Sequence, residues 1–229
     1  MTESIPFERY RPIVDDWHAF QDKILAPLPV CVWTNTLRLT PEALANFMAE
    51  DGLPFEQLGW YPQGFKLPAG IKPGNQWPYL AGLYHVQEEV SMMPVQMLDP
   101  QPGERVLDLC AAPGNKTAQI AIALENRGTV IANDINFGRL KALRQSIEWL
   151  GITNITTTVY DGGNYPREAG LFDKILVDAP CSCEGTSRRG VRRHIHTYIH
   201  RYIHAYRPGQ TDCTSPRTLT LHHSCNIDR

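Results

Sequence analysis

The sequence lacks any long run of apolar residues. Its longest run, Ile120–Leu124, is far shorter than the roughly 20 residues that a membrane-spanning helix needs. Residues 1–10 also lack the apolar centre of a secretory signal. We therefore expect a cytoplasmic protein with no membrane partner.

The chain lacks an export signal to accompany its cysteines. Six cysteines are scattered over the 229 residues. Proteins that stay inside the cell keep their thiols reduced, so reactive or inert thiols are expected rather than disulfides. The cysteines are Cys31, Cys110, Cys181, Cys183, Cys213 and Cys225.

The chain also lacks an overall excess of positive charge, because its formal net charge is −2. The net charge is −6 over residues 1–100, zero over residues 101–189 and +4 over residues 190–229. Phosphate binding usually requires a basic face. Total charge therefore gives no support to a nucleic-acid partner, and nothing in the sequence decides the oligomeric state.

Residues 1–100 predict a small α+β domain. Thr40 and Pro41 mark the start of a helix, since Thr is a common N-cap and Pro fits the first turn. The expected elements are a helix within Ile13–Leu25, a strand within Val30–Leu39, the helix after Thr40, and a helix over Tyr84–Leu98 that Pro94 would kink or split.

Residues 101–189 predict a parallel α/β sheet. Four apolar, β-branched segments alternate with helical ones: "RVLDLC", "TVIANDI", "NITTTVY" and "KILVDAP". Such alternation is typical of a doubly wound sheet with helices on both faces. Ligands of these folds bind at the carboxyl ends of the strands.

Each of the four expected strands ends at an aspartate or leads into one. These residues are Asp108, Asp134, Asp161 and Asp178. Any one of them could simply cap a helix. Four carboxylates along one sheet edge are hard to attribute to capping, so we predict a ligand site there.

A short loop follows the first of these strands, with the sequence "CAAPGNK". It consists of Cys110, Ala111, Ala112, Pro113, Gly114, Asn115 and Lys116. Its small residues would let the backbone approach a ligand, and the next helix offers free N–H groups to an anion. The spacing is not that of GxGxxG or of a phosphate loop. Asp134, about twenty residues beyond, is placed to accept hydrogen bonds from ribose hydroxyls.

Three segments together resemble the Sun/Fmu family of RNA cytosine 5-methyltransferases. They are "VLDLCAAPGNKT", "IANDIN" and "ILVDAPCSCEGTSRR", and the resemblance covers about residues 28–189. It implies S-adenosylmethionine as the cofactor and RNA, either rRNA or tRNA, as the partner. It also implies a Rossmann-like class I methyltransferase sheet in residues 101–189, with about four of its seven strands, and an RNA-binding role for residues 1–100.

The resemblance also assigns roles within the site. Cys110–Lys116 would line the methionine part of the cofactor, with Lys116 and the helix start facing its carboxylate. Asp134 would hold the ribose and Asp161 would lie near the adenine. Asp178 would lie between the cofactor's amino group and the target base.

The chemistry explains why the family uses cysteines. Carbon 5 of cytosine attacks a methyl group only after a thiolate has added to carbon 6, and a base must then remove the proton from carbon 5. In the family one cysteine of a Pro-Cys loop assists product release and another, in a Thr-Cys pair, forms the covalent bond. Cys181 matches the first, although an inert buried thiol is the alternative. No Thr-Cys pair follows, and Cys213 is a poor match.

Residues 190–229 differ in composition from the rest of the chain. They contain six of the eight histidines but no Lys, Glu, Met, Phe or Trp. One interpretation is a metal-binding or RNA-stacking stripe, because Tyr198, Tyr202 and Tyr206 share a helical face. We favour a shifted reading frame near Arg189, and we expect a tail that is not natively folded and no metal site.

The main expectation is therefore an RNA cytosine 5-methyltransferase that is truncated or frame-shifted after about residue 189, with doubtful activity. The alternative is a non-catalytic remnant that binds RNA or the cofactor. A methyltransferase for another substrate is disfavoured by "DAPC", which differs from the loop of enzymes that methylate exocyclic amines.

Overall fold

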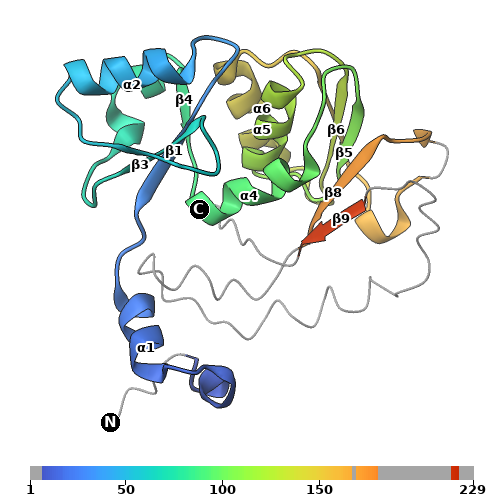
Figure 1. Ribbon diagram of the computed structural model, residues 1–229. Coiled ribbons are helices and arrows are strands. Elements are labelled where there is room, and N and C mark those ends of the chain that lie inside the picture. The colour runs from blue at the N-terminus through green and yellow to red at the C-terminus, as the bar shows by residue number, and fades with distance from the viewer. Residues whose placement is uncertain (1–6, 167–168, 180–217, 222–229) are drawn as a thin grey trace.

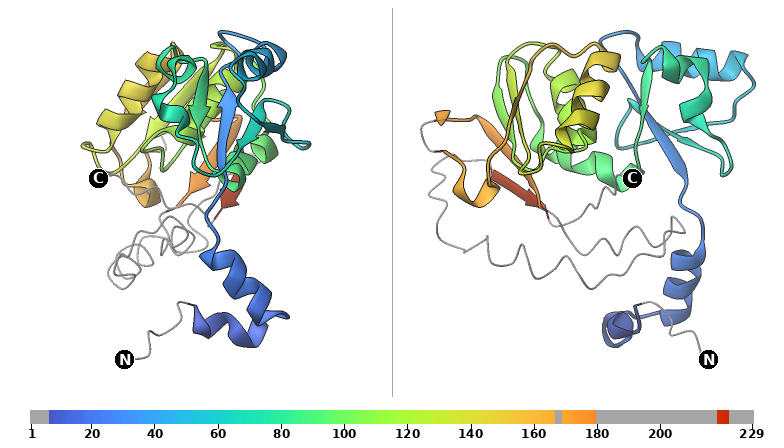
Figure 2. Two further views of the ribbon diagram at one scale, coloured as in Figure 1. Left: turned by 90° about the vertical axis from the view of Figure 1, so that its left-hand side faces the viewer. Right: turned by 180° about the vertical axis from the view of Figure 1, so that it is seen from behind.

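The computed structural model describes residues 7–166, 169–179 and 218–221. They form two β-sheets with a layer of helices between them (Figure 1). The N-terminal sheet has four strands and the second sheet has five. Two short helices, η1 (Glu8–Ile13) and α1 (Trp17–Leu25), lie apart from this body in all views (Figures 1 and 2).

The N-terminal sheet is antiparallel and has the strand order β2-β3-β1-β4. Side chains of its central strand alternate between two apolar clusters. Cys31 and Trp33 pack towards the helix layer, whereas Val32 packs with Leu44 of α2. The strands are β1 (Val30–Thr34), β2 (Glu56–Gln57), β3 (Gly64–Leu67) and β4 (Tyr84–Val86).

Helix α2 (Pro41–Glu50) confirms the expected start signal. The hydroxyl oxygen of Thr40 accepts a hydrogen bond from the backbone N–H of Ala43 at 3.2 Å, and Pro41 occupies the first turn. The connection between β3 and β4 contains only a 3-10 turn and a short helix. These are η2 (Pro73–Asn75) and α3 (Trp77–Leu80).

The expected helix over Tyr84–Leu98 is wrong in its first part. The first three residues form β4, because Trp33 pairs with His85 and Val32 with Val86 across the sheet. The helix, α4, spans Glu89–Leu98 and continues through Pro94. Pairing with a strand about fifty residues away therefore overrides the local helical pattern.

The second sheet confirms the predicted parallel α/β fold. Its strand order is β7-β6-β5-β8-β9, and all its pairs are parallel. The chain runs outwards from β5 to β7 and then returns to the other side of β5. The strands are β5 (Arg105–Asp108), β6 (Thr129–Asn133), β7 (Ile155–Thr158), β8 (Lys174–Asp178) and β9 (Thr218–Leu221).

Helices cover only one face of this sheet within the described residues. Val106, Val130 and Leu176 pack against α4 and α5 (Asn115–Ala123), and α6 (Leu140–Leu150) lies beside α5. The opposite face packs on Tyr165 and Phe172 from the link between β7 and β8. That link contains three glycines and a proline, and its described residues include the 3-10 turn η3 (Gly162–Asn164). The expectation of helices on both faces stays a prediction.

Strand β9 covers the edge of β8. Its backbone pairs in parallel from Ile175 opposite Thr218 to Asp178 opposite Leu221. These four residues belong to the segment that the sequence marks as atypical. The edge of β8 is thus covered by part of the tail. The expectation that the tail as a whole is not natively folded stays a prediction.

The N-terminal sheet is fixed to the helix layer by polar contacts. The Asn35 amide Nδ2 donates to the Leu150 carbonyl at 2.8 Å and to the Gly82 carbonyl at 2.9 Å. Arg38 Nη2 donates to the Trp149 carbonyl at 3.2 Å. These donors satisfy carbonyls at the end of α6 that the helix itself leaves open.

Candidate functional site

The carboxyl ends of β5 and β8 form a small pocket. The two strands are neighbours in the sheet, although the chain visits β6 and β7 between them. Such a reversal of strand order is where open α/β sheets bind their ligands. The pocket is lined by Asp108, Cys110, Ala111, Ala112, Asn115, Lys116 and Asp178.

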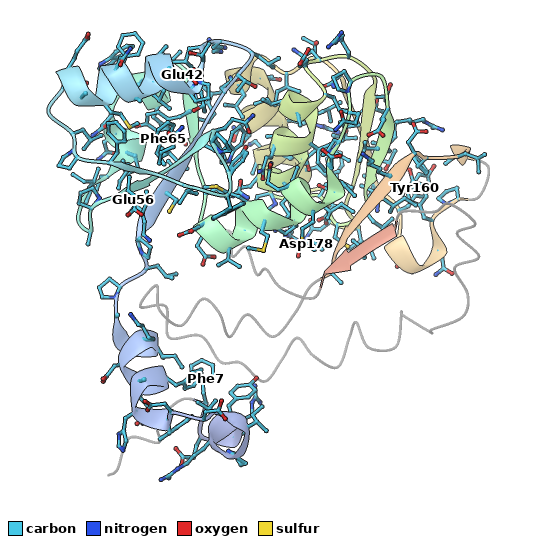
Figure 3. All side chains as sticks on the ribbon, viewed as in Figure 1. Phe7, Glu42, Glu56, Phe65, Tyr160 and Asp178 are labelled. Atoms are coloured by element: carbon cyan, nitrogen blue, oxygen red, sulfur yellow. The ribbon has the colours of Figure 1, made fainter. Side chains whose placement is uncertain are left out.

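A buried ion pair crosses this pocket. Lys116 in the first turn of α5 places its Nζ 2.7 Å from Oδ2 of Asp178 at the end of β8. The two side chains are only 5% and 12% exposed. Figure 3 shows Asp178 at the carboxyl end of β8, next to α4. Sequence reasoning named both residues for the site, and the structure brings them together.

Asp108 is the most deeply buried carboxylate of the pocket, at 1% exposure. The Thr117 hydroxyl donates to its Oδ2 at 2.6 Å, whereas Oδ1 has no hydrogen-bond partner among the described residues. Burial, with a smaller contribution from nearby Asp178, raises the pKa of Asp108 to about 7. Sequence reasoning placed Asp108 at the sheet edge but gave it no binding role.

The "CAAPGNK" loop owes its small residues partly to packing. Ala111 and Ala112 are buried against Leu140 and Leu143 of α6. Gly114 has φ +112, and a Cβ added to it would lie 2.9 Å from the Leu143 Cγ. Only glycine fits both the backbone angle and the space. Pro113 and Gly114 therefore shape the loop without lining the pocket.

Cys110 lines the pocket as a half-buried free thiol. Burial, reinforced by Asp108, Asp134 and Asp178, raises the pKa of Cys110 to about 12. The thiol is protonated at neutral pH and is therefore a poor nucleophile. This agrees with a role in lining the site rather than in covalent chemistry.

Asp134 lies buried beside the pocket and ties two loops together. Its Oδ2 accepts from the Ala112 N–H at 3.2 Å and its Oδ1 accepts from the Asn136 N–H at 2.8 Å. Arg139 Nη1 lies 3.4 Å from the same carboxylate. The structure thus brings Asp134 to the "CAAPGNK" loop, although not into the pocket lining. Its expected contact with a ribose stays a prediction.

Asp161 lies further along the sheet edge and caps η3. Its Oδ1 accepts from the Gly163 N–H at 3.1 Å, and its Oδ2 accepts from Asn164 Nδ2 at 2.8 Å. It follows β7, which β6 separates from β5, so it is not among the pocket-lining residues. Cys181, Cys183 and Cys213 lie outside the described residues.

One contributor comes from the N-terminal sheet and carried no sequence signal. His85 of β4 is 6% exposed, and its Nε2 lies 3.2 Å from Oδ1 of the pocket residue Asn115. Burial lowers the pKa of His85 to about 4, so its ring is neutral at physiological pH. His85 lies on a strand of the N-terminal sheet and Asn115 begins α5, thirty positions further along the chain, which is why no local pattern pointed to the contact.

None of the helices in the described part of the chain has the length and apolar character to span a bilayer.

Comparison with known proteins matches the family described as 16S rRNA methyltransferase RsmB/F to residues 95–201. A mouse 28S rRNA (cytosine-C(5))-methyltransferase is 42% identical over 161 residues, which are 69% of this chain and 20% of that protein. A ribosomal RNA small subunit methyltransferase F from Shewanella amazonensis is 38% identical over 168 residues, 71% of this chain and 36% of that protein.

A solved structure, titled as a methyltransferase homolog protein from Pyrococcus horikoshii, is similar in three dimensions. It has a TM-score of 0.68 and 35% identity, with coverage of 74% of this chain and 56% of that one. Strand order, pocket position and this likeness define a Rossmann-like class I methyltransferase fold. With the RsmB/F match and the rRNA relatives, the chain belongs to the Sun/Fmu family of RNA cytosine 5-methyltransferases. It spans between a fifth and about a third of the length of the two curated relatives.

Proposed function

We propose that the pocket at the ends of β5 and β8 binds S-adenosylmethionine for methylation of carbon 5 of cytosine in RNA. The observation that carries the proposal is the buried Asp108 Oδ1. Asp108 lines a pocket at the strand-order reversal, and its Oδ1 has no partner within the described chain. A buried carboxylate oxygen without a donor costs free energy unless a ligand supplies one.

The residues of the pocket fit this cofactor. Asp108 offers an acceptor for an amino group. The first turn of α5 offers N–H groups and a positive dipole end for a carboxylate. Lys116 adds a positive charge close by, balanced by Asp178. When bound, the cofactor would supply the methyl group, and the protein would supply the orientation.

Further roles follow from the family resemblance. Asp134 would hold the ribose, supported by its position against Ala112. Asp161 would lie near the adenine. Asp178, positioned by Lys116, would face both the amino group and the target base. Cys181 follows Asp178 by three residues and would assist product release. The cytosolic location also stays a prediction.

The partner RNA is proposed to be ribosomal, because the two curated relatives are named as rRNA methyltransferases. The covalent step requires a second cysteine, which the family carries in a Thr-Cys pair. Residues 190–229 contain no such pair. We therefore expect this chain to bind the cofactor without forming a covalent RNA complex.

Titration calorimetry with S-adenosylhomocysteine tests the cofactor site. Asp108→Asn and Asp134→Ala should each weaken binding by about tenfold or more, since a hydrogen bond to a charged group contributes about 1.5–3 kcal/mol. Asp15→Asn, which removes an exposed carboxylate far from the pocket, is the matched control and should bind like the wild type. A folded wild-type protein that does not bind the ligand would refute the cofactor site and favour a non-catalytic RNA-binding module.

A further inference from the structure

His85 is a polar residue in a place that an apolar ring could fill. Its imidazole lies between the rings of Trp33 and Trp149, with centroid distances of 5.3 Å and 5.8 Å. Its Nδ1 is buried without a hydrogen-bond partner among the described residues. A buried, unpartnered nitrogen is unfavourable. A purely structural role would therefore be better served by phenylalanine.

The contact made by the other ring nitrogen, Nε2, indicates the role of His85. His85 Nε2 lies 3.2 Å from Oδ1 of Asn115, and an amide oxygen can only accept a hydrogen bond. A hydrogen on Nδ1 would be buried without an acceptor among the described residues, so the hydrogen of the neutral ring is assigned to Nε2, which donates to this oxygen. The ring is held as a single neutral tautomer, because its low pKa prevents protonation at neutral pH.

This contact also fixes the orientation of the Asn115 amide. Asn115 is the first residue of α5 and lines the pocket. With Oδ1 held by His85, the amide cannot exchange its oxygen and nitrogen without placing two donors against each other. Nδ2 has no partner among the described residues, and it is the only donor of this side chain. The N-terminal domain thus sets the polarity of one wall of the pocket.

We propose that His85 is a positioning residue that holds the Asn115 amide so that Nδ2 donates to the carboxylate of the cofactor's amino-acid part. The inference rests on the proposed function, because it requires that ligand in the pocket. It deepens that function by assigning a specificity contact to the N-terminal domain. The contact between β4 and α5 would thus contribute to ligand selection.

The test compares two ligands that differ only in the amino-acid part. S-adenosylhomocysteine carries the amino and carboxylate groups, whereas 5′-methylthioadenosine lacks both. His85→Phe fills the space between the two tryptophans but cannot donate. It should weaken binding of S-adenosylhomocysteine by about tenfold, and it should leave binding of 5′-methylthioadenosine within about twofold of the wild type.

Two further variants separate positioning from packing. His85→Gln keeps a donor near the position of Nε2 and should retain most of the affinity for S-adenosylhomocysteine. Asn115→Ala should reproduce the loss seen in His85→Phe. The double variant should bind no more weakly than either single one, because both changes remove the same contact. If His85→Phe fails to fold, His85→Leu takes its place, because it also removes the donor and carries the same predicted outcomes.

The outcomes distinguish the two proposals. If the folded wild type binds neither ligand, the cofactor site itself is wrong. If the wild type binds S-adenosylhomocysteine but His85→Phe weakens both ligands equally, the positioning role is overturned and the proposed function stands. Additive losses in the double variant would likewise overturn the positioning role.

Discussion

At the residue scale, Asp108 shows how burial at a strand end creates a functional group. Its neighbours Thr117 and Lys116 come from α5, and Asp178 comes from the adjacent strand. The four strand-end aspartates could be recognised in the sequence from the periodicity of the strands. Their different positions relative to the pocket could not be predicted, because these positions depend on the order of the strands in the sheet. Asp108 and Asp178 end neighbouring strands, whereas Asp161 follows the edge strand β7.

The raised pKa of Asp108 makes a prediction about stability. Its pKa is about 7 in the folded protein, against an ordinary value of 3.8. The folded state holds the proton more tightly, so the contribution of Asp108 to stability is fully present below pH 3.8 and is lost as the pH rises to about 7. From pH 5 to pH 8, the free energy of unfolding of the wild type should fall relative to Asp108→Asn by about 2 kcal/mol.

Urea unfolding of both proteins at several pH values measures this difference. Asp15→Asn serves again as the control, because it removes an exposed carboxyl that lies apart from Asp108 (Figure 1). A constant difference between wild type and Asp108→Asn over this pH range would mean that the carboxyl is ionised throughout, contrary to its burial.

The contact between His85 and Asn115 shows where residue-level reasoning from sequence ends. Asn115 was expected in the site because it belongs to the "CAAPGNK" loop. His85 was not, since it lies on a strand of the other sheet and within a segment that resembled a helix. Only the packing of β4 against α5 and α6 brings its ring to the pocket.

At the element scale, elements marked by local sequence signals could be predicted from the sequence, whereas an element fixed by pairing with a distant strand could not. The start of α2 at Thr40 and Pro41 was confirmed, as were the four parallel strands with β-branched residues. Strand β4 was missed because three residues carry little pattern of their own and are fixed by pairing with β1. Tyr165 and Phe172 of the glycine-containing link after β7 pack on the far face of the sheet, a contact that no local pattern predicted.

Packing of the "CAAPGNK" loop on α6 makes the prediction at this scale. Gly114→Ala would adopt an unfavourable φ and push its Cβ to 2.9 Å from Leu143 Cγ. It should lower the free energy of unfolding by about 2–4 kcal/mol, the sum of backbone strain and overpacking. Gly103→Ala has a similar φ of +97 but nothing within 4 Å of its Cβ, so it isolates the backbone contribution of about 1–2 kcal/mol.

Thermal or urea unfolding of the two variants measures the difference between them. Equal destabilisation would show that the loop does not press against α6. A larger loss for Gly114→Ala, together with weaker binding of S-adenosylhomocysteine, would connect this packing to the shape of the pocket.

At the scale of the whole molecule, the helix layer joins the two sheets into one body. A single apolar cluster contains Trp33 of β1, Met92 of α4, Ile120 of α5 and Val106 of β5. This core crosses the boundary that the sequence suggested near residue 100. The division into domains at residues 100 and 189 stays a prediction, and the core explains how the N-terminal domain can reach the pocket with His85.

The proposed function depends on a cofactor pocket at the carboxyl ends of β5 and β8. Hydrogen–deuterium exchange with and without saturating S-adenosylhomocysteine tests this most directly. We predict slower exchange at the amides of residues 109–118, which include the "CAAPGNK" loop and the first turn of α5, and little change in α1 or α2. Binding of the ligand with unchanged exchange in residues 109–118 would contradict the assignment of the pocket.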